Sequence, residues 1–97
     1  MVLTIVPWGD DPIFEWDEYN EVEIYRHRVT CFEVEECFEN PYGAAPHNKA
    51  KSEPHKYGDR YRVKGKTNGG RELFIILQYK GGKVVRPVTV FDSTKKT

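Results

Sequence analysis

The chain lacks several features that mark large classes of small proteins. It holds two cysteines, Cys31 and Cys37, too few for the disulfide framework of a secreted domain, so we expect buried free thiols. The longest apolar run, residues 73–77, is far too short to cross a bilayer. No basic leader precedes Pro7, which makes the opening a poor secretory signal. We therefore expect a cytoplasmic protein without a membrane segment.

The sequence is also poor in patterns that bind metals or phosphate cofactors. The spacings of Cys31, Cys37, His47 and His55 fit no zinc site. The two Gly-Gly pairs precede expected strands rather than helices, which is typical of turns and not of phosphate loops. We therefore expect neither a metal nor a cofactor.

The net charge is zero, yet the two halves of the chain differ sharply. Residues 1–53 hold 12 Asp or Glu and 4 Lys or Arg, whereas residues 54–97 hold 3 and 11. Two interpretations carry equal weight at this point. Either the halves neutralise each other within one fold, or the basic half presents a face that binds anions.

The length of 97 residues fits one domain with a modest core, helped by 13% aromatic residues. We expect a single domain over residues 1–97. Residues 1–11 are a candidate N-terminal extension, in which residues 2–6 favour an edge strand or a flexible segment. Residues 92–97 are expected to form a polar tail.

Two helices are expected in the acidic half. After a short strand over residues 12–16, Asp17 has the chemistry of an N-cap, and a helix over about residues 18–27 follows. Thr30, with Glu33 three positions later, fits a capping box that begins a second helix. That helix is expected to end where the sequence reads Asn-Pro, at residues 40–41.

The basic half favours strands. Residues 41–58 read as a long surface loop with room for one short strand. Residues 60–66, 72–80 and 84–91 then read as a meander, and the apolar middle strand is expected to be buried on both faces. The predicted fold class is therefore α+β, with two N-terminal helices packed on a small antiparallel sheet.

The first meander strand alternates cations with apolar residues. Arg60, Arg62, Lys64 and Lys66 point one way, while Tyr61 points the other. A two-residue turn at Gly81-Gly82 would set Leu77 opposite Arg86. A four-residue turn at 67–70 would set Arg60 opposite Leu77, and a two-residue turn at 69–70 would set Arg62 there instead. Either row holds two arginines ~10 Å apart, which suits consecutive phosphates, although most basic strand faces are merely solvated.

A set of short motifs in a fixed order resembles the BrnT family of toxins over roughly residues 13–96. The motifs are Phe14-Glu15-Trp16-Asp17, Asn20, His27, Val29-Thr30, Glu33–Glu36, Arg60-Tyr61-x-Val63-x-Gly65, Gly70-Arg71-x-Leu73 and Val85-Arg86-Pro87-Val88-Thr89. Their order and spacing are more specific than any single motif.

This resemblance implies a RelE-like fold and a ribonuclease toxin of a type II toxin-antitoxin module. It implies metal-independent cleavage of RNA, neutralisation by a ribbon-helix-helix antitoxin, and contact with DNA only through the antitoxin complex. Carried over residue by residue, His27 is the expected acid or base, and Arg60 and Arg86 are expected to clamp phosphate. The expected substrate-binding residues are Arg62, Lys64, Arg71 and Tyr61, with Arg71 at a turn where a structural role competes.

Three departures from the family pattern bear on activity. Glu23 stands where many relatives place His or Asn, Phe91 replaces an arginine, and the segment 41–58 is longer than expected. The alternative function is therefore a non-catalytic module on the same fold. Such a module would bind a protein partner through the acidic helices, or bind RNA without cleaving it.

Overall fold

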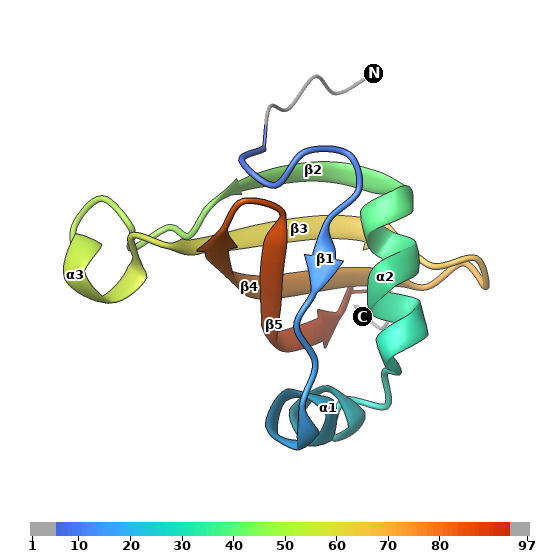
Figure 1. The fold of residues 1–97 in the computed structure, drawn as a ribbon. Coiled ribbons are helices and arrows are strands. Elements are labelled where there is room, and N and C mark those ends of the chain that lie inside the picture. Colours follow the sequence, from blue (N-terminus) through green and yellow to red (C-terminus); the bar gives the residue numbers. More distant parts are fainter. Residues whose placement is uncertain (1–5, 94–97) are drawn as a thin grey trace.

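The computed structural model describes residues 6–93 and has an α+β fold with one mixed five-stranded sheet (Figure 1). The elements along the chain are β1 (Ile13–Phe14), α1 (Glu18–Tyr25), α2 (Cys31–Glu39), β2 (Pro41–Pro46), α3 (Pro54–Tyr57), β3 (Arg60–Lys66), β4 (Glu72–Gly81) and β5 (Val84–Asp92). The strand order is β1-β5-β4-β3-β2. The expected strand at residues 2–6 and the tail after residue 93 lie largely outside the described residues.

Helix α1 begins as predicted and ends earlier. Asp17 accepts hydrogen bonds from the N–H groups of Tyr19 and Asn20, which confirms it as the N-cap. The expected end at residue 27 was wrong, because the helix stops at Tyr25 in a tight closing turn. His27 therefore lies in that turn and not in a regular helix.

The turn after α1 depends on one residue in an unusual backbone conformation. The N–H of Val29 donates to the carbonyl of Ile24, and the N–H of Arg28 donates to that of Tyr25. This is the Schellman arrangement, which places the residue before Val29 in the left-handed region. Arg28 has a φ of 60°, at a position where glycine is the usual residue.

Helix α2 follows the prediction closely. The Thr30 hydroxyl accepts the N–H of Glu33, and the Glu33 carboxylate accepts the N–H of Thr30, so the capping box is confirmed. Both cysteines are free, with Cys37 fully buried and Cys31 partly buried. Burial raises the pKa of the Cys37 thiol to about 12, which keeps it an unreactive thiol at neutral pH.

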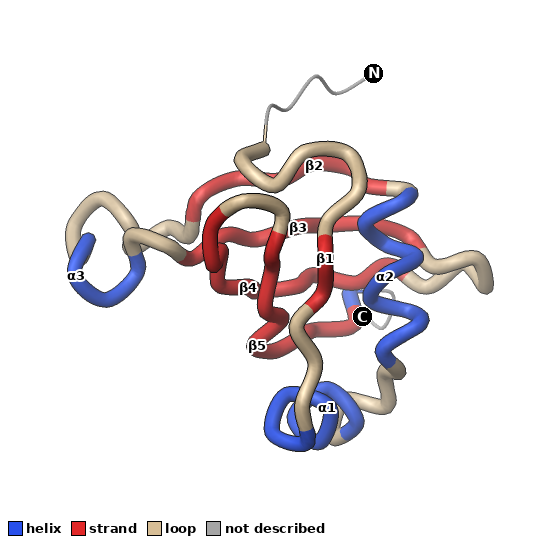
Figure 2. Tube along the Cα trace, viewed as in Figure 1, coloured by secondary structure: helices blue, strands red, loops and turns tan. Residues whose placement is uncertain are grey.

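The sheet contains the predicted meander of β3, β4 and β5, but the expectation of a purely antiparallel sheet was wrong. Strand β1 precedes both helices in the chain and forms the edge of the sheet next to β5 (Figure 2). It pairs in parallel with the start of β5. The predicted loop 41–58 does contain a strand, β2, which pairs with β3. It also contains the short helix α3.

Both hairpins of the meander have a register one residue away from the expected one. The β3–β4 connection is residues 67–71. The β4–β5 turn is Gly82-Lys83 rather than Gly81-Gly82, and the register shifts again between Tyr79 and Gly81. A second bulge, between Pro87 and Thr89 of β5, lies further from the turn, as the missing N–H of proline favours. Gln78, not Leu77, therefore lies opposite both Arg60 and Arg86. The reason is burial, since Leu77 is 0% exposed and must face the core.

The two faces of the sheet differ. We call the one beneath α2 and Trp8 the covered face; its buried side chains are Val63, Leu73, Ile75, Leu77, Val85 and Val90. Gly65 belongs to this face, and a Cβ there would collide with the carbonyl of Cys37 in α2. The other, here the open face, carries Arg60, Arg62, Lys64, Phe74, Ile76, Gln78, Thr89 and Phe91. Phe74 and Ile76 stay partly exposed there, so the expected burial of β4 on both faces was wrong.

Candidate functional site

The open face arranges its side chains in rows that run across three strands. One row is Arg62, Ile76 and Thr89, and the next is Lys64, Phe74 and Phe91. Directly paired residues of antiparallel strands point to the same side of the sheet. Each row therefore joins a cation on β3 to an apolar residue on β4 and then to a residue on β5.

A hollow lies at the β3 end of these rows. It has a volume of about 400 Å³ and is lined by Tyr42, Gly43, Ala44, Ala45, Arg62, Lys64 and Phe74. Its floor is apolar, two cations stand beside it, and the Tyr42 side chain is 42% exposed. A flat apolar ring with an adjacent cation is the arrangement that stacks a base while holding its phosphate.

The cations of the hollow differ in their partners. Arg62 forms no side-chain hydrogen bond or ion pair within residues 6–93, and its Nε atom is buried without a hydrogen-bond partner. Lys64 has only a loose contact, with its Nζ 3.9 Å from Glu72 Oε1. Arg60 is similar, at 3.9 Å from Asp59 Oδ1. These three charges are available to a ligand because exposed ion pairs at such distances are weak.

The β5 end of the rows meets the turn after α1. His27 Nε2 lies 3.4 Å from Glu23 Oε2, and Glu23 Oε2 accepts a hydrogen bond of 3.0 Å from the Thr89 hydroxyl. The His27 ring contacts the Phe91 ring edge to face at 5.8 Å between centroids. A carboxylate fixed by a hydroxyl and placed beside an imidazole orients that imidazole for proton transfer.

Sequence reasoning missed this group around His27. Glu23 was placed on the same helix face as His27 and noted as a departure from the family pattern, but it was given no role. Phe91 was noted only as a departure, and Thr89 only as part of a motif. The i, i+4 spacing of Glu23 and His27 was visible in the sequence and favours a contact. The Thr89 contact was not visible, because it depends on how α1 docks against the edge of β5.

Two predicted site arginines are held by carboxylates instead of facing a ligand. Arg86 Nη1 lies 2.8 Å from Asp17 Oδ2 and 3.2 Å from Glu15 Oε1. Arg71 donates to Asp92, to Glu33 and to the carbonyl of Arg28. Hydrogen bonding to Asp17 raises the pKa of Arg86, and hydrogen bonding to Asp92 raises that of Arg71. At these two positions the acidic and basic halves of the chain neutralise each other.

The predicted site residues are only partly brought together. Arg60, Arg62 and Lys64 share the open face. Phe91 lies two strands, or ~10 Å, across from Lys64, and His27 lies beyond it, with its ring 5.8 Å from the Phe91 ring. Arg60 and Arg86 share the row of Gln78. From strand spacing and rise, Arg60 lies roughly 16 Å from Phe91, the residue that His27 contacts. Tyr61 lies on the covered face.

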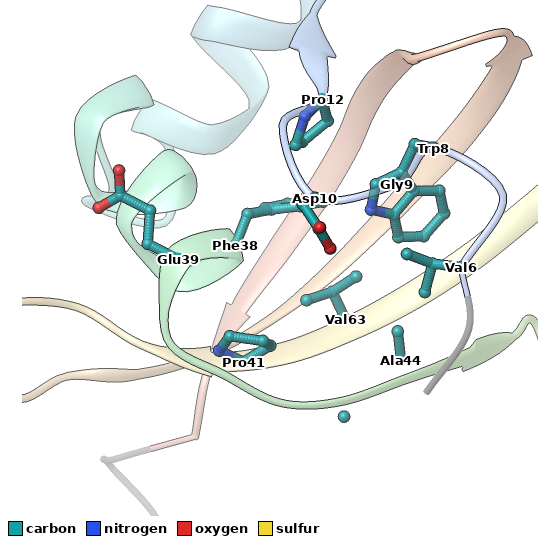
Figure 3. Close-up of a pocket in the computed structure, with 11 residues that line it drawn as sticks. Val6, Trp8, Gly9, Asp10, Pro12, Phe38, Glu39, Pro41, Ala44 and Val63 are labelled. Atoms are coloured by element: carbon teal, nitrogen blue, oxygen red, sulfur yellow. The ribbon is translucent and has the colours of Figure 1, made fainter. Parts of the chain in front are cut away.

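Trp8 lines a different hollow, on the covered side of the sheet. Its ring meets that of Tyr61 edge to face at 5.3 Å. This hollow, of about 460 Å³, lies between the segment that carries Trp8 and the strands β2 and β3, with Val63 and Ala44 below the indole (Figure 3). None of the predicted site residues lines it.

Comparison of the chain with protein-family models, with curated proteins and with solved structures finds no match. Within residues 6–93, no group of three or more His, Cys, Asp or Glu side chains is placed to hold a metal ion. None of the described helices is long and apolar enough to cross a membrane.

Proposed function

We propose that this protein is a BrnT-like ribonuclease toxin with a RelE-like fold, which cleaves RNA on its open face. One observation carries the proposal. One sheet face has an apolar hollow with the unpaired Arg62 and the loosely paired Lys64 at one end, and an imidazole beside a carboxylate at the other. The motifs that resemble BrnT toxins supply the expected reaction.

In the proposed reaction the ribose 2′-hydroxyl attacks the neighbouring phosphorus. His27 takes the hydroxyl proton as the new oxygen–phosphorus bond forms, and the bond from phosphorus to the 5′-oxygen breaks. The departing oxygen takes a proton from water, which leaves a cyclic phosphate and a 5′-hydroxyl. Glu23 keeps the imidazole in place and stabilises the charge it gains.

The cations have separate roles in this proposal. Arg62 and Lys64 hold the phosphate and stabilise the negative charge that develops on its oxygens, because they share the rows that lead to His27. Arg60 holds the next phosphate along β3. Arg86 and Arg71 position α1 and the end of β5 through their carboxylate partners.

A second candidate function, a protein-binding module, is favoured by the outer surface of the helices. A hollow of about 510 Å³ lies between α1 and α2, with Val22, Tyr25 and Phe32 beside it. Tyr25 is 73% exposed and Phe32 is 78% exposed. Nearby Glu21 and Glu35 would favour a basic, apolar segment of a partner such as a ribbon-helix-helix antitoxin.

The deciding experiment compares expression of the wild type with that of His27→Ala and Arg62→Ala, with growth and total RNA followed together. The matched control is Arg26→Ala, because Arg26 is an exposed cation beside His27 with only a weak contact to Glu23. We expect growth arrest and RNA loss in the wild type and control. Purified His27→Ala should cleave RNA about 10²–10⁴-fold more slowly.

The two candidate functions give opposite results. A folded wild-type protein that leaves growth and RNA intact would refute the ribonuclease proposal. In that case Phe32→Ala should abolish capture of the cognate partner while the His27 and Arg62 variants retain it. Loss of activity in all variants equally, Arg26→Ala included, would also contradict the assigned site.

A further inference from the structure

The segment between β2 and β3, residues 47–58 and here called the arm, leaves the sheet and carries α3. It stands away from the strands, at the end of the sheet opposite α2 (Figures 1 and 2). Its base is held at the start of β3, because the N–H of His47 donates to the backbone carbonyl of Arg60 at 2.9 Å. A ligand that runs along β3 past Arg60 therefore reaches the arm next.

The arm carries more positive than negative charge. It has three lysines, Lys49, Lys51 and Lys56, and one acid, Glu53. Within residues 6–93, none of the three ammonium groups forms an ion pair with a carboxylate. Lys64 and Lys80 on the sheet, by contrast, each have a carboxylate oxygen within 4.0 Å. Cations without ion-pair partners on a projecting segment are typical of a surface that binds a polyanion.

Two of these lysines are held in place by one aromatic ring. The Lys49 and Lys56 ammonium groups lie 5.7 and 5.5 Å from the centroid of the Tyr57 ring. The His47 ring stacks on Tyr57 at 4.6 Å with an interplanar angle of 11°. Attraction to the ring holds both cations near Tyr57 and offsets part of the repulsion between them.

The orientation of His47 adds a third donor to this group. The N–H of Lys49 donates to His47 Nδ1 at 3.1 Å, so the proton of the neutral imidazole sits on Nε2. The ring-centred cluster of His47, Lys49, Lys56 and Tyr57 thus offers two ammonium groups and one N–H, and no acceptor from an acid. Such a group fits the oxygens of a phosphate.

We propose that this ring-centred cluster binds the phosphate backbone of single-stranded RNA where the strand continues past Arg60. The inference rests on the proposed function, because it extends the same RNA beyond the open face. Single-stranded RNA fits better than a rigid duplex, since the strand must bend from the sheet onto a narrow arm. The arm would then raise affinity for long RNA and leave the cleavage site unchanged.

The test is fluorescence anisotropy with 2′-O-methyl oligonucleotides, which cannot be cleaved, of about 4 and about 16 nucleotides. Lys49→Ala/Lys56→Ala is compared with the wild type. The matched control, Lys51→Ala/Lys83→Ala, also removes two charges but leaves the cluster intact. Tyr57→Leu keeps all charges and removes the ring, and circular dichroism confirms that each variant is folded.

We expect Lys49→Ala/Lys56→Ala to bind the long oligonucleotide about tenfold more weakly and the short one within about twofold of the wild type. Its salt slope, log Kd against log salt, should fall by roughly 1.4, the value for two lost phosphate contacts on a single strand. Tyr57→Leu should lose part of the same affinity, and the control pair should lose less than either.

Three results would overturn the proposal. They are an unchanged affinity for the long oligonucleotide, an equal loss on both lengths, and an equal loss in the control pair. In each of these cases the proposed function still stands if the wild type binds the short oligonucleotide. A wild type that binds neither length refutes the proposed function and the arm together.

Discussion

The two faces of the sheet are built from alternate residues of the same strands, yet they differ in how deeply their side chains are buried. On β4, Leu73, Ile75 and Leu77 are 0% exposed on the covered face. Their neighbours Phe74 and Ile76 keep part of their surface exposed on the open face. The covered face supplies most of the free energy of folding, and the open face keeps apolar surface available for a ligand.

The arginines repeat this difference. Arg86 pairs with Asp17, and Arg71 pairs with Glu33, both carboxylates of the acidic half of the chain. Arg71 also pairs with Asp92 of its own half, whereas Arg62 has no such partner within residues 6–93. The interpretation that the two halves neutralise each other is confirmed at Arg71 and Arg86, which pair with Glu33 and with Asp17 and Glu15. The interpretation that the basic half binds an anion stays a proposal, and it now concerns the cations of β3 and the arm.

The largest expected effect comes from two adjacent isoleucines of β4. Ile75→Ala should destabilise the protein by about 3–4 kcal/mol, because it leaves a cavity in a fully buried cluster. Ile76→Ala should cost only about 1 kcal/mol, since its side chain already meets solvent. Urea denaturation of both variants measures the difference in the free energy of unfolding.

Function should respond in the opposite order. At a temperature where both variants are folded, Ile76→Ala should weaken RNA binding and Ile75→Ala should leave it near the wild-type value. Equal destabilisation by the two substitutions would mean that another element covers the open face.

The sequence predicted local structure well because capping and patterning act over a few residues. Asp17, Thr30 and Glu33 identified the starts of both helices, and the cationic alternation identified β3 to the residue. Both signals depend on neighbours that are close in the chain. The end of α1 was missed, because a left-handed Arg28 is not the glycine that normally marks a closing turn.

Long-range features were predicted less well. The registers of both hairpins differ by one residue from the expected ones, and in a strand a one-residue shift moves a row to the other face. Because both registers shifted in the same sense, Arg60 and Arg86 still share a row, now with Gln78. The carboxylates around Arg86 and the Thr89–Glu23 contact depend on how α1 docks at β5, and no local pattern encodes that docking.

A smaller effect on stability is expected at Arg28, which lies in the chain between His27 at the open face and Val29 in the core. His27 contacts Phe91 on the open face, Val29 is 0% exposed in the core, and Arg28 between them has a φ of 60°. Arg28→Gly should stabilise the protein by about 0.5–1 kcal/mol, because glycine adopts this conformation without strain.

The matched control is the same substitution two residues earlier. Arg26 has a φ of −58°, so Arg26→Gly should destabilise the protein by about 0.5–1 kcal/mol. Thermal or urea unfolding measures both values. Two substitutions of the same sign would show that Arg28 stabilises the turn through its side chain.

The smallest expected effect concerns how the free energy of unfolding changes with pH in acid. Hydrogen bonding to Arg86, together with the N–H groups of Asn20 and Tyr19, lowers the pKa of Asp17 below its ordinary value of 3.8. In the folded state this carboxylate therefore binds a proton less readily than in the unfolded state. Its contribution is present above pH 3.8 and is lost as the pH falls through the lowered pKa.

Asp17→Asn keeps an N-cap side chain and removes the titration, so the fall of unfolding free energy with acid should become shallower below about pH 4. Arg86→Met should flatten the same part of the profile by removing the largest cause of the shift. Urea denaturation between about pH 2.5 and 7 checks both. Parallel profiles for all three proteins would mean that Arg86 is not held by Asp17 in solution, and would return it to the set of arginines available for phosphate.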